Sequence, residues 1–279
     1  MKKLFTGVCT ALITPFNKHN DVDYVALGRL IKNQIDSGVD ALLILGTTGE
    51  APTLSLDEKK SIINFTIEIV AKRVPVVVGI GGNNPSSIIE LGLYAKSVGA
   101  DAVMVTAPYY NKATQDGMVK FFNHIAKNVQ LPMIVYNVPG RCSVNILPET
   151  MERIAKNKLV YGIKEASGNI EQIQTIVRLC PNTAVYSGDD TIALPCYAVG
   201  CVGIISVASN ARPAAVASIH KNFIARKVTT ARRRYFEHLP YFQSLFSQVN
   251  PIPIKHELSK MGICKNILRL PLTPFDTNR

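Results

Sequence analysis

Residues 37–42, Ser-Gly-Val-Asp-Ala-Leu, reappear in similar form as residues 98–103, Val-Gly-Ala-Asp-Ala-Val. Residues 199–204, Val-Gly-Cys-Val-Gly-Ile, are a looser copy. In each copy a glycine follows a helical pattern, and an aliphatic run begins just after it. Glycine ends a helix readily because it adopts the left-handed conformation without strain. The repeat therefore predicts a recurring junction from helix to strand, as in a chain built of βα units.

Eight short aliphatic runs occur along the chain, each followed by a loop and then a helical pattern. We expect strands at residues 8–13, 41–45, 76–80, 102–106, 133–136, 160–164, 184–187 and 203–206. Each run is almost continuously apolar, which is typical of parallel strands covered on both faces. Eight alternations favour an α/β fold, a closed (β/α)8 TIM barrel, over an open sheet. No Gly-x-Gly-x-x-Gly sequence follows the first run, so a dinucleotide-binding fold has little support.

The segments between these runs have helical character. Residues 23–37 place apolar side chains at helical spacing, and capping or first-turn residues begin further helices at Asp57, Pro85, Gln115, Pro148 and Asn169. We expect the strands and most barrel helices within residues 1–210. Residues 211–279 would carry the last barrel helix and extra C-terminal helices, at 212–226 and 229–249, packed on the barrel.

The composition indicates a large core. The 279 residues are 47% hydrophobic and 18% charged, which argues against disorder. No apolar run reaches eighteen residues, so we expect no membrane span. Met1-Lys2-Lys3 and the apolar run after it resemble a short signal peptide, and Cys9 could suggest a lipoprotein site. No small-residue cleavage pattern follows, and Val8 stands where a lipoprotein signal has a small residue, so we interpret the run as a buried strand.

The net charge of +11 is uneven, with twelve Lys and Arg against three acids from Arg212 onward. The run Arg232-Arg233-Arg234 could bind nucleic acid. No binding motif accompanies it, so we interpret it as a solvated helix face on a basic protein with anionic substrates. Six cysteines show no Cys-x-x-Cys pair, and five histidines add no ligand pattern. We expect reduced thiols in a reducing compartment and no metal site.

Polar residues gather at the carboxyl ends of the expected strands, where this fold places its chemistry. Lys164 ends the apolar run Leu159-Val160-Tyr161-Gly162-Ile163, so its ammonium group would point into the barrel mouth. Partial desolvation lowers the pKa of a lysine, and the neutral amine can attack a carbonyl carbon. The alternative is a rim lysine paired with Glu165. Neighbouring strand residues face opposite sides, so Glu165 is poorly placed for that pairing.

Other strand ends supply hydroxyls and a guanidinium group. Tyr136 closes the preceding strand and could move protons beside Lys164, or it could simply fill the barrel. Thr47 and Thr48 lie between glycines, where hydroxyls and backbone N–H groups can bind a carboxylate. Arg141 follows a rigid Pro-Gly turn and could grip a carboxylate with two N–H groups, or it could form a surface ion pair.

Together these motifs resemble the dihydrodipicolinate synthases, within the pyruvate-dependent class I aldolase family that also includes N-acetylneuraminate lyase. The resemblance covers nearly the whole chain, at residues 7–16, 46–50, 108–111, 136–141, 162–167, 187–190, 203–207, 250–253 and 268–271. It implies that Lys164 forms a Schiff base with pyruvate. It also implies a proton relay of Tyr136, Thr47 and Tyr110, in which Tyr110 reaches into the site of a neighbouring subunit.

The resemblance also implies substrate-binding roles. Thr48 and the backbone around Ile205, near Gly188, would bind pyruvate, and Arg141 resembles the arginine that holds the carboxylate of L-aspartate semialdehyde. The implied reaction condenses pyruvate with L-aspartate 4-semialdehyde in lysine and diaminopimelate biosynthesis. The implied enzyme is a cytoplasmic homo-oligomer, dimer or tetramer, that needs no metal or organic cofactor and binds neither nucleic acid nor membrane.

Two alternatives remain open. Another pyruvate-dependent aldolase, acting on a 2-keto-3-deoxy sugar acid or on N-acetylneuraminate, would share Lys164 and Tyr136. N-acetylneuraminate lyases generally lack the Tyr-Asn-Val-Pro-Gly-Arg sequence that ends at Arg141, which favours the synthase. The alternative from a different class is a basic barrel that binds nucleic acid without catalysis.

One departure from the family pattern concerns regulation. Lysine-inhibited relatives carry polar or acidic effector-pocket groups at positions that match Ala51, Leu56, Lys59 and Ser87. These positions are largely altered here, although Asn83 and Tyr109 remain. We therefore expect weak or absent inhibition by L-lysine.

Overall fold

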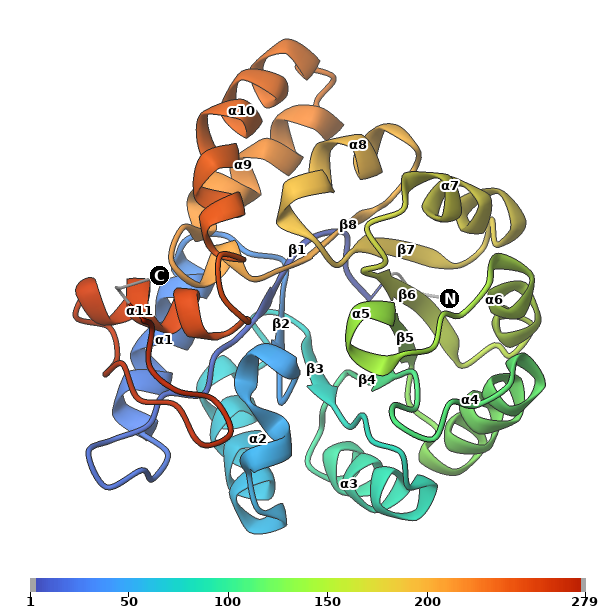
Figure 1. Cartoon of the computed structure of the whole chain (residues 1–279), viewed down its shortest axis with the longest axis horizontal. Helices are drawn as coiled ribbons and strands as arrows, with labels where there is room; N and C mark the ends of the chain where they lie inside the picture. Colours follow the sequence, from blue (N-terminus) through green and yellow to red (C-terminus); the bar gives the residue numbers. More distant parts are fainter. Residues whose placement is uncertain (1–3, 277–279) are drawn as a thin grey trace.

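The computed structural model describes residues 4–276. Eight parallel strands form a closed barrel in chain order, and β1 also pairs with β8 (Figure 1). The strands are β1 Gly7–Ala11, β2 Ala41–Ile44, β3 Val76–Gly79, β4 Ala102–Thr106, β5 Met133–Asn137, β6 Val160–Glu165, β7 Ala184–Ser187 and β8 Gly203–Ser206. Every predicted strand is present, and its ends differ from the prediction by at most two residues. The expected (β/α)8 TIM barrel is confirmed.

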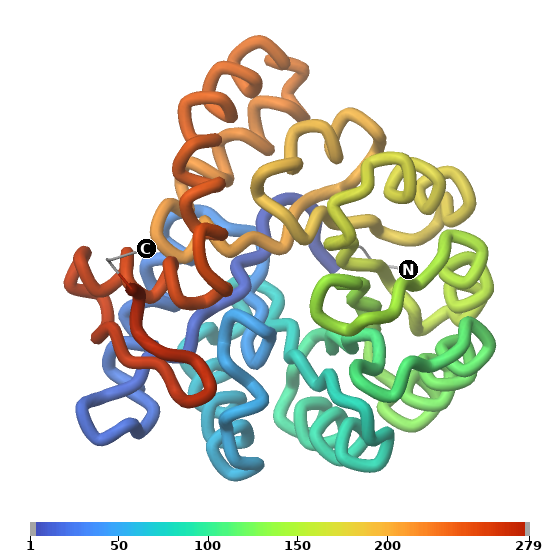
Figure 2. Tube along the Cα trace, in the orientation of Figure 1, coloured from blue at the N-terminus to red at the C-terminus, as the bar shows by residue number. Residues whose placement is uncertain are grey.

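Helices cover the outside of this barrel, as the trace in Figure 2 shows, and α5 lies over its mouth. They are α1 Tyr24–Asp36, α2 Leu56–Val70, α3 Pro85–Ser97, α4 Gln115–Val129, α5 Pro139–Cys142, α6 Pro148–Ala155, α7 Ile170–Leu179, α8 Ala193–Ala198, α9 Pro213–Ile224, α10 Val228–Ser244 and α11 Ile252–Lys260. Side-chain caps fix several starts. Asp23 accepts a hydrogen bond from the Ala26 N–H, and Ser55 and Glu58 form a reciprocal capping box at α2.

The repeated stretch has a structural explanation. Its glycines, Gly38 and Gly99, have φ angles of 77° and 94° and so lie in the left-handed region. The aspartate two residues after each glycine binds the start of a neighbouring strand. Asp40 accepts a hydrogen bond from the Val8 N–H at 2.8 Å, and the same distance for Asp101 and the Val76 N–H is 2.9 Å. Each of these two copies of the repeat therefore ends a helix with its glycine and binds the start of a barrel strand with its aspartate.

The amino end of the barrel is closed by the chain that precedes β1. Phe5 stacks on Tyr186 with 4.5 Å between ring centroids, and the Tyr186 hydroxyl donates a hydrogen bond to the Phe5 carbonyl at 2.9 Å. Tyr186 is fully buried. These contacts fill the amino end of the barrel, whereas α5 lies over the mouth at the carboxyl ends of the strands (Figure 1).

Three helices were not predicted: α5, α8 and α11. The first two span only four and six residues, too few for a helical pattern to show. The helix α11 begins within the Pro251–Pro253 region that sequence reasoning had treated only as a motif. The segment after it passes close to the start of α2, where Arg269 binds Glu58.

The beginning of the chain was open to two interpretations. Its apolar run forms β1, the buried strand that we expected, whereas Met1-Lys2-Lys3 lie outside the described residues. Within residues 4–276, no helix combines the length and the apolar character needed to cross a membrane.

Candidate active site

Most of the expected site residues surround one small cavity at the carboxyl ends of the strands. The cavity has a volume of about 120 Å³, which is space for a few water molecules or a small organic acid. Six of the eight predicted residues line it: Thr47, Thr48, Tyr136, Arg141, Lys164 and Gly188. Tyr110 and Ile205 do not.

Lys164 lies near the carboxyl end of β6 and is only 5% exposed. Its Nζ lies 4.4 Å from the ring centroid of Tyr136, its register partner on β5. Burial lowers the pKa of Lys164 to about 8. Cys9 and Asp190 oppose this effect, and Arg141 adds to it. At pH 7 about a tenth of the amine is then neutral, compared with roughly one part in three thousand for an ordinary lysine. The geometry therefore makes Lys164 a usable nucleophile.

Glu165 does not pair with Lys164, as the alternation of strand residues predicted. Its buried carboxylate accepts hydrogen bonds from Asn137 Nδ2 at 2.9 Å, Gln172 Nε2 at 3.1 Å and the Ser167 N–H at 2.7 Å. Asn137 is its register partner and directly follows Tyr136. These bonds tie the ends of β5 and β6 together on the side of the sheet away from the cavity.

Tyr136 lies at the same level of the barrel as Lys164 and is 5% exposed. Burial raises its pKa to about 12, while the nearby Arg141 and a hydrogen bond with Thr47 oppose the rise. The phenol therefore keeps its proton at neutral pH and can donate it. A tyrosine beside a neutral amine is suited to carry protons to and from groups that react there.

Thr47 and Thr48 belong to a short 3-10 turn, Thr47–Gly49, that follows β2. Thr48 is buried, and its Oγ1 accepts a hydrogen bond from Asn250 Nδ2 at 3.0 Å. The Thr14 hydroxyl donates to the Gly49 carbonyl at 2.7 Å, which fixes the turn to the chain after β1. The turn that carries both threonines is thereby held at the cavity.

Arg141 and Gly188 shape two sides of the cavity. Arg141 is exposed on α5 at the mouth, and its Nη2 donates to the Asn250 carbonyl at 3.0 Å. A Cβ on Gly188 would lie 2.6 Å from the Ala166 Cβ and 3.1 Å from the Lys164 Cε. Glycine at position 188 therefore leaves the space through which the Lys164 side chain extends.

The two remaining predicted residues lie elsewhere. Tyr110 is 88% exposed, with a φ angle of 75°, so it is outside the cavity of its own chain. Ile205 is buried in β8, and Val207, two residues further on, lines the cavity instead.

Sequence reasoning missed further residues at this site. Asn250 lines the cavity and binds both Thr48 and Arg141, but it was singled out only as part of a motif. Asp190, which was also singled out only as part of the motif at residues 187–190, is buried next to the site. Its carboxylate accepts hydrogen bonds from Ser206 Oγ at 2.5 Å and from two backbone N–H groups, those of residues 207 and 208, at 2.9 and 3.0 Å. It thus holds the chain that follows β8.

A larger cavity of about 610 Å³ lies beside the small one and shares Thr47, Val138 and Arg141 with it. The positions considered for L-lysine all line this larger cavity: Ala51, Leu56, Lys59, Asn83, Ser87 and Tyr109. Burial lowers the pKa of Lys59 there.

Comparison with known proteins identifies the family. The chain matches the Dihydrodipicolinate synthetase family over residues 4–279. It is 45% identical over 273 residues to the 4-hydroxy-tetrahydrodipicolinate synthase of Geobacter sulfurreducens, which covers 98% of this chain and 94% of that relative.

Solved structures agree with this match. The dihydrodipicolinate synthase of Thermotoga maritima gives a TM-score of 0.97 at 40% identity, with 99% of this chain and 95% of that chain covered. The chloride-inhibited dihydrodipicolinate synthase of Acinetobacter baumannii, complexed with pyruvate, gives a TM-score of 0.96 at 37% identity over 98% and 94% of the two chains. The family match over almost the whole chain, together with these relatives, shows that the chain belongs to the dihydrodipicolinate synthetase family.

Proposed function

We propose that the protein catalyses the 4-hydroxy-tetrahydrodipicolinate synthase reaction, which condenses pyruvate with L-aspartate 4-semialdehyde in lysine and diaminopimelate biosynthesis. The observation that carries this proposal is Lys164, a buried lysine with a lowered pKa in a cavity lined by hydroxyl groups and Arg141. The names of the relatives support the same reaction, and the Acinetobacter baumannii structure is described with pyruvate.

The first half of the reaction forms a Schiff base on Lys164. Its neutral Nζ attacks the ketone carbon of pyruvate to give a carbinolamine, and loss of one water gives a protonated imine. The imine withdraws electrons, so the methyl group loses a proton and an enamine forms. The enamine carbon then attacks the aldehyde carbon of the semialdehyde, and the aldehyde oxygen becomes a hydroxyl.

The second half releases the enzyme. The amino group of the bound adduct attacks the imine carbon, closes the six-membered ring and returns Lys164 as a free amine. No step in this sequence draws on a metal or an organic cofactor.

Protons would move through Tyr136, which lies beside Lys164 and has a hydrogen bond with Thr47. Tyr110 would complete this relay. Because it is 88% exposed and outside its own cavity, it would serve the cavity of a neighbouring copy, as the family resemblance implies. We therefore infer a homo-oligomer, a dimer or a tetramer, in which each subunit donates Tyr110 to another.

The carboxylates of the two substrates would bind on different sides of the cavity. Thr48, Gly188 and the backbone around Ile205 would hold pyruvate on Lys164. Arg141, at the mouth, would hold the carboxylate of the semialdehyde, because a guanidinium group can bind a carboxylate with two parallel hydrogen bonds. We also propose a cytoplasmic location, in which the six free thiols stay reduced.

Borohydride trapping tests the central step. Pyruvate and borohydride should add the mass of pyruvic acid minus one oxygen atom to a peptide that contains Lys164. The Lys164→Ala variant is the control, and we expect no adduct from it. A pyruvate adduct that persists in this variant would refute the assignment of the nucleophile.

The acceptor is tested by turnover with L-aspartate 4-semialdehyde, followed through coupled reduction of the cyclic product. Arg141→Ala should raise the KM for the aldehyde, whereas pyruvate should still be trapped on Lys164. Trapping without turnover in the wild type would keep the pyruvate chemistry and favour the alternative reaction, cleavage of a 2-keto-3-deoxy sugar acid or of N-acetylneuraminate.

A further inference from the structure

The turn that carries Thr47 and Thr48 ends at a buried acidic residue, Glu50. Glu50 is 2% exposed and has a φ angle of 52°, so its backbone lies in the left-handed region. A non-glycine residue holds that conformation only when its surroundings fix it. The contacts of Glu50 are therefore the contacts that fix the end of the turn.

Both carboxylate oxygens of Glu50 are held by the C-terminal part of the chain. Lys255, on α11, forms a fully buried ion pair with Glu50 Oε1, and its Nζ also donates to the Ile267 carbonyl at 2.9 Å. The Arg269 backbone N–H donates to Glu50 Oε2 at 3.0 Å. We call Asn250, Lys255 and Arg269 the C-terminal clamp.

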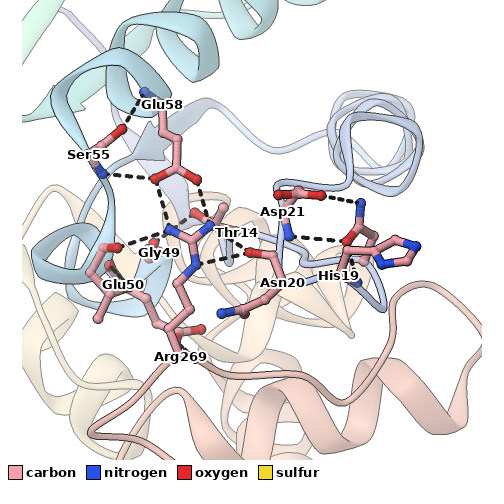
Figure 3. Close-up of polar contacts among 11 residues, drawn as sticks. Thr14, His19, Asn20, Asp21, Gly49, Glu50, Ser55, Glu58 and Arg269 are labelled. Carbon is pink, nitrogen blue, oxygen red and sulfur yellow. Dashed lines mark hydrogen bonds and ion pairs between the residues drawn. The ribbon is translucent and has the colours of Figure 1, made fainter.

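The side chain of Arg269 anchors the clamp to the barrel, as Figure 3 shows. Its guanidinium group forms an ion pair with Glu58 at 2.5 Å and donates to the Asn20 carbonyl at 2.7 Å. The same group and the Lys255 ammonium lie over the ring of Phe16, at 4.4 and 4.0 Å from its centroid. Both cations thus have fixed positions on a buried aromatic ring.

Asn250 gives the clamp a second contact with the turn. Its Nδ2 donates to Thr48 Oγ1 and its carbonyl accepts from Arg141 Nη2, both at 3.0 Å. The clamp therefore holds the turn at Thr48 and at Glu50, on either side of Gly49. Thr47, which is hydrogen-bonded to Tyr136, lies at the start of the same turn.

Stability alone does not account for a buried Glu–Lys pair at this place. The desolvation of two charges offsets most of their attraction, and an apolar pair of similar volume is often equally stable. The pair differs from an apolar contact in its geometry. It fixes the direction and distance of a carboxylate that is rigidly connected to Thr47 and Thr48.

We propose that Glu50 is a positioning residue for the reaction: held by the C-terminal clamp, it keeps Thr47 against Tyr136 and Thr48 against the bound pyruvate. This inference rests on the proposed function of the cavity. It adds a residue that touches no substrate but determines where the proton relay lies.

The test separates positioning from folding with three variants. Glu50→Gln leaves Lys255 buried without a counter-ion, so its Tm should fall by roughly 5–15 °C. Glu50→Gln/Lys255→Met removes both charges, and its Tm should recover most of that loss. Ile125→Ala empties a buried position on α4, away from the cavity, and is the control for destabilisation alone. All measurements are made below the lowest Tm, with folding checked by circular dichroism.

The readout is the exchange of pyruvate methyl protons in D2O, followed by NMR without any aldehyde, together with kcat. In both Glu50 variants we expect exchange and kcat to fall roughly 10–100-fold, because small misplacements of reacting groups are costly. The fraction of Lys164 trapped at saturating pyruvate should stay at the wild-type value, and Ile125→Ala should exchange normally. Exchange within twofold of wild type in the double variant would overturn the proposal, as would an equal loss in Ile125→Ala. Wild-type exchange without turnover of the semialdehyde would instead refute the proposed function alone.

Discussion

The pH dependence of adduct formation follows directly from the burial of Lys164. With a pKa of about 8, the neutral fraction of the amine is about 1% at pH 6, 50% at pH 8 and 90% at pH 9. The rate constant for trapping pyruvate, at pyruvate concentrations far below saturation, should therefore rise about 50-fold from pH 6 to pH 8 and less than about twofold from pH 8 to pH 10.

The assay quenches the reaction with borohydride at timed intervals and measures the modified fraction of the Lys164 peptide by mass spectrometry. Lys164→Arg controls for modification at other lysines, and circular dichroism at each pH confirms that the protein stays folded. An ordinary lysine would give a tenfold increase for each pH unit up to about pH 10. That profile would refute the argument that desolvation in the cavity activates Lys164.

The remaining predictions concern the same cavity and its neighbour. Gly188→Ala should slow adduct formation by roughly 100-fold, because the new Cβ would lie 2.6 Å from Ala166 Cβ and 3.1 Å from Lys164 Cε; trapping at the wild-type rate would contradict this. Lys164→Met should raise the free energy of unfolding at pH 7 by about 3 kcal/mol, measured with denaturant. The sign follows from the lowered folded-state pKa, because unfolding binds protons between about pH 8 and pH 10.5. Lys164 therefore lowers the free energy of unfolding by the full amount below about pH 8, and this loss disappears above about pH 10.5. L-Lysine should inhibit weakly or not at all, because Lys59 places a cationic side chain in the larger cavity; an inhibition constant in the micromolar range would show that the altered positions still bind it.

The fold was predictable because its signals are local. Each strand is an aliphatic run that a helical pattern follows, and Gly38 and Gly99 mark where helices end. The helices α5 and α8 left no such signal, because one or two turns are too short for periodicity to appear. Even the roles of Asp40 and Asp101 could not be derived, since each binds a strand that only the closed barrel brings next to it.

The candidate site was predictable to the extent that it consists of strand ends. Lys164, Tyr136 and Thr47 follow three separate aliphatic runs, and a parallel barrel brings such ends to one side. Asn250 follows no strand. It reaches the cavity because the chain after α10 returns over the barrel mouth, and no local pattern indicates that return. The catalytic and binding roles of these residues remain predictions.

Two buried lysines show how the environment decides what the same side chain does. Lys255 and Lys164 are 0% and 5% exposed, and burial lowers the pKa of both. Glu50 opposes this effect at Lys255 through a direct ion pair, and the resulting contact fixes a turn. Among residues 4–276 no carboxylate lies within 4.0 Å of the Lys164 ammonium. The carboxylate of Glu165, the next residue, accepts hydrogen bonds from Asn137, Gln172 and a backbone N–H instead. An unpaired lysine in such a place costs stability, and that cost is the physical reason why its neutral, nucleophilic form is accessible near neutral pH.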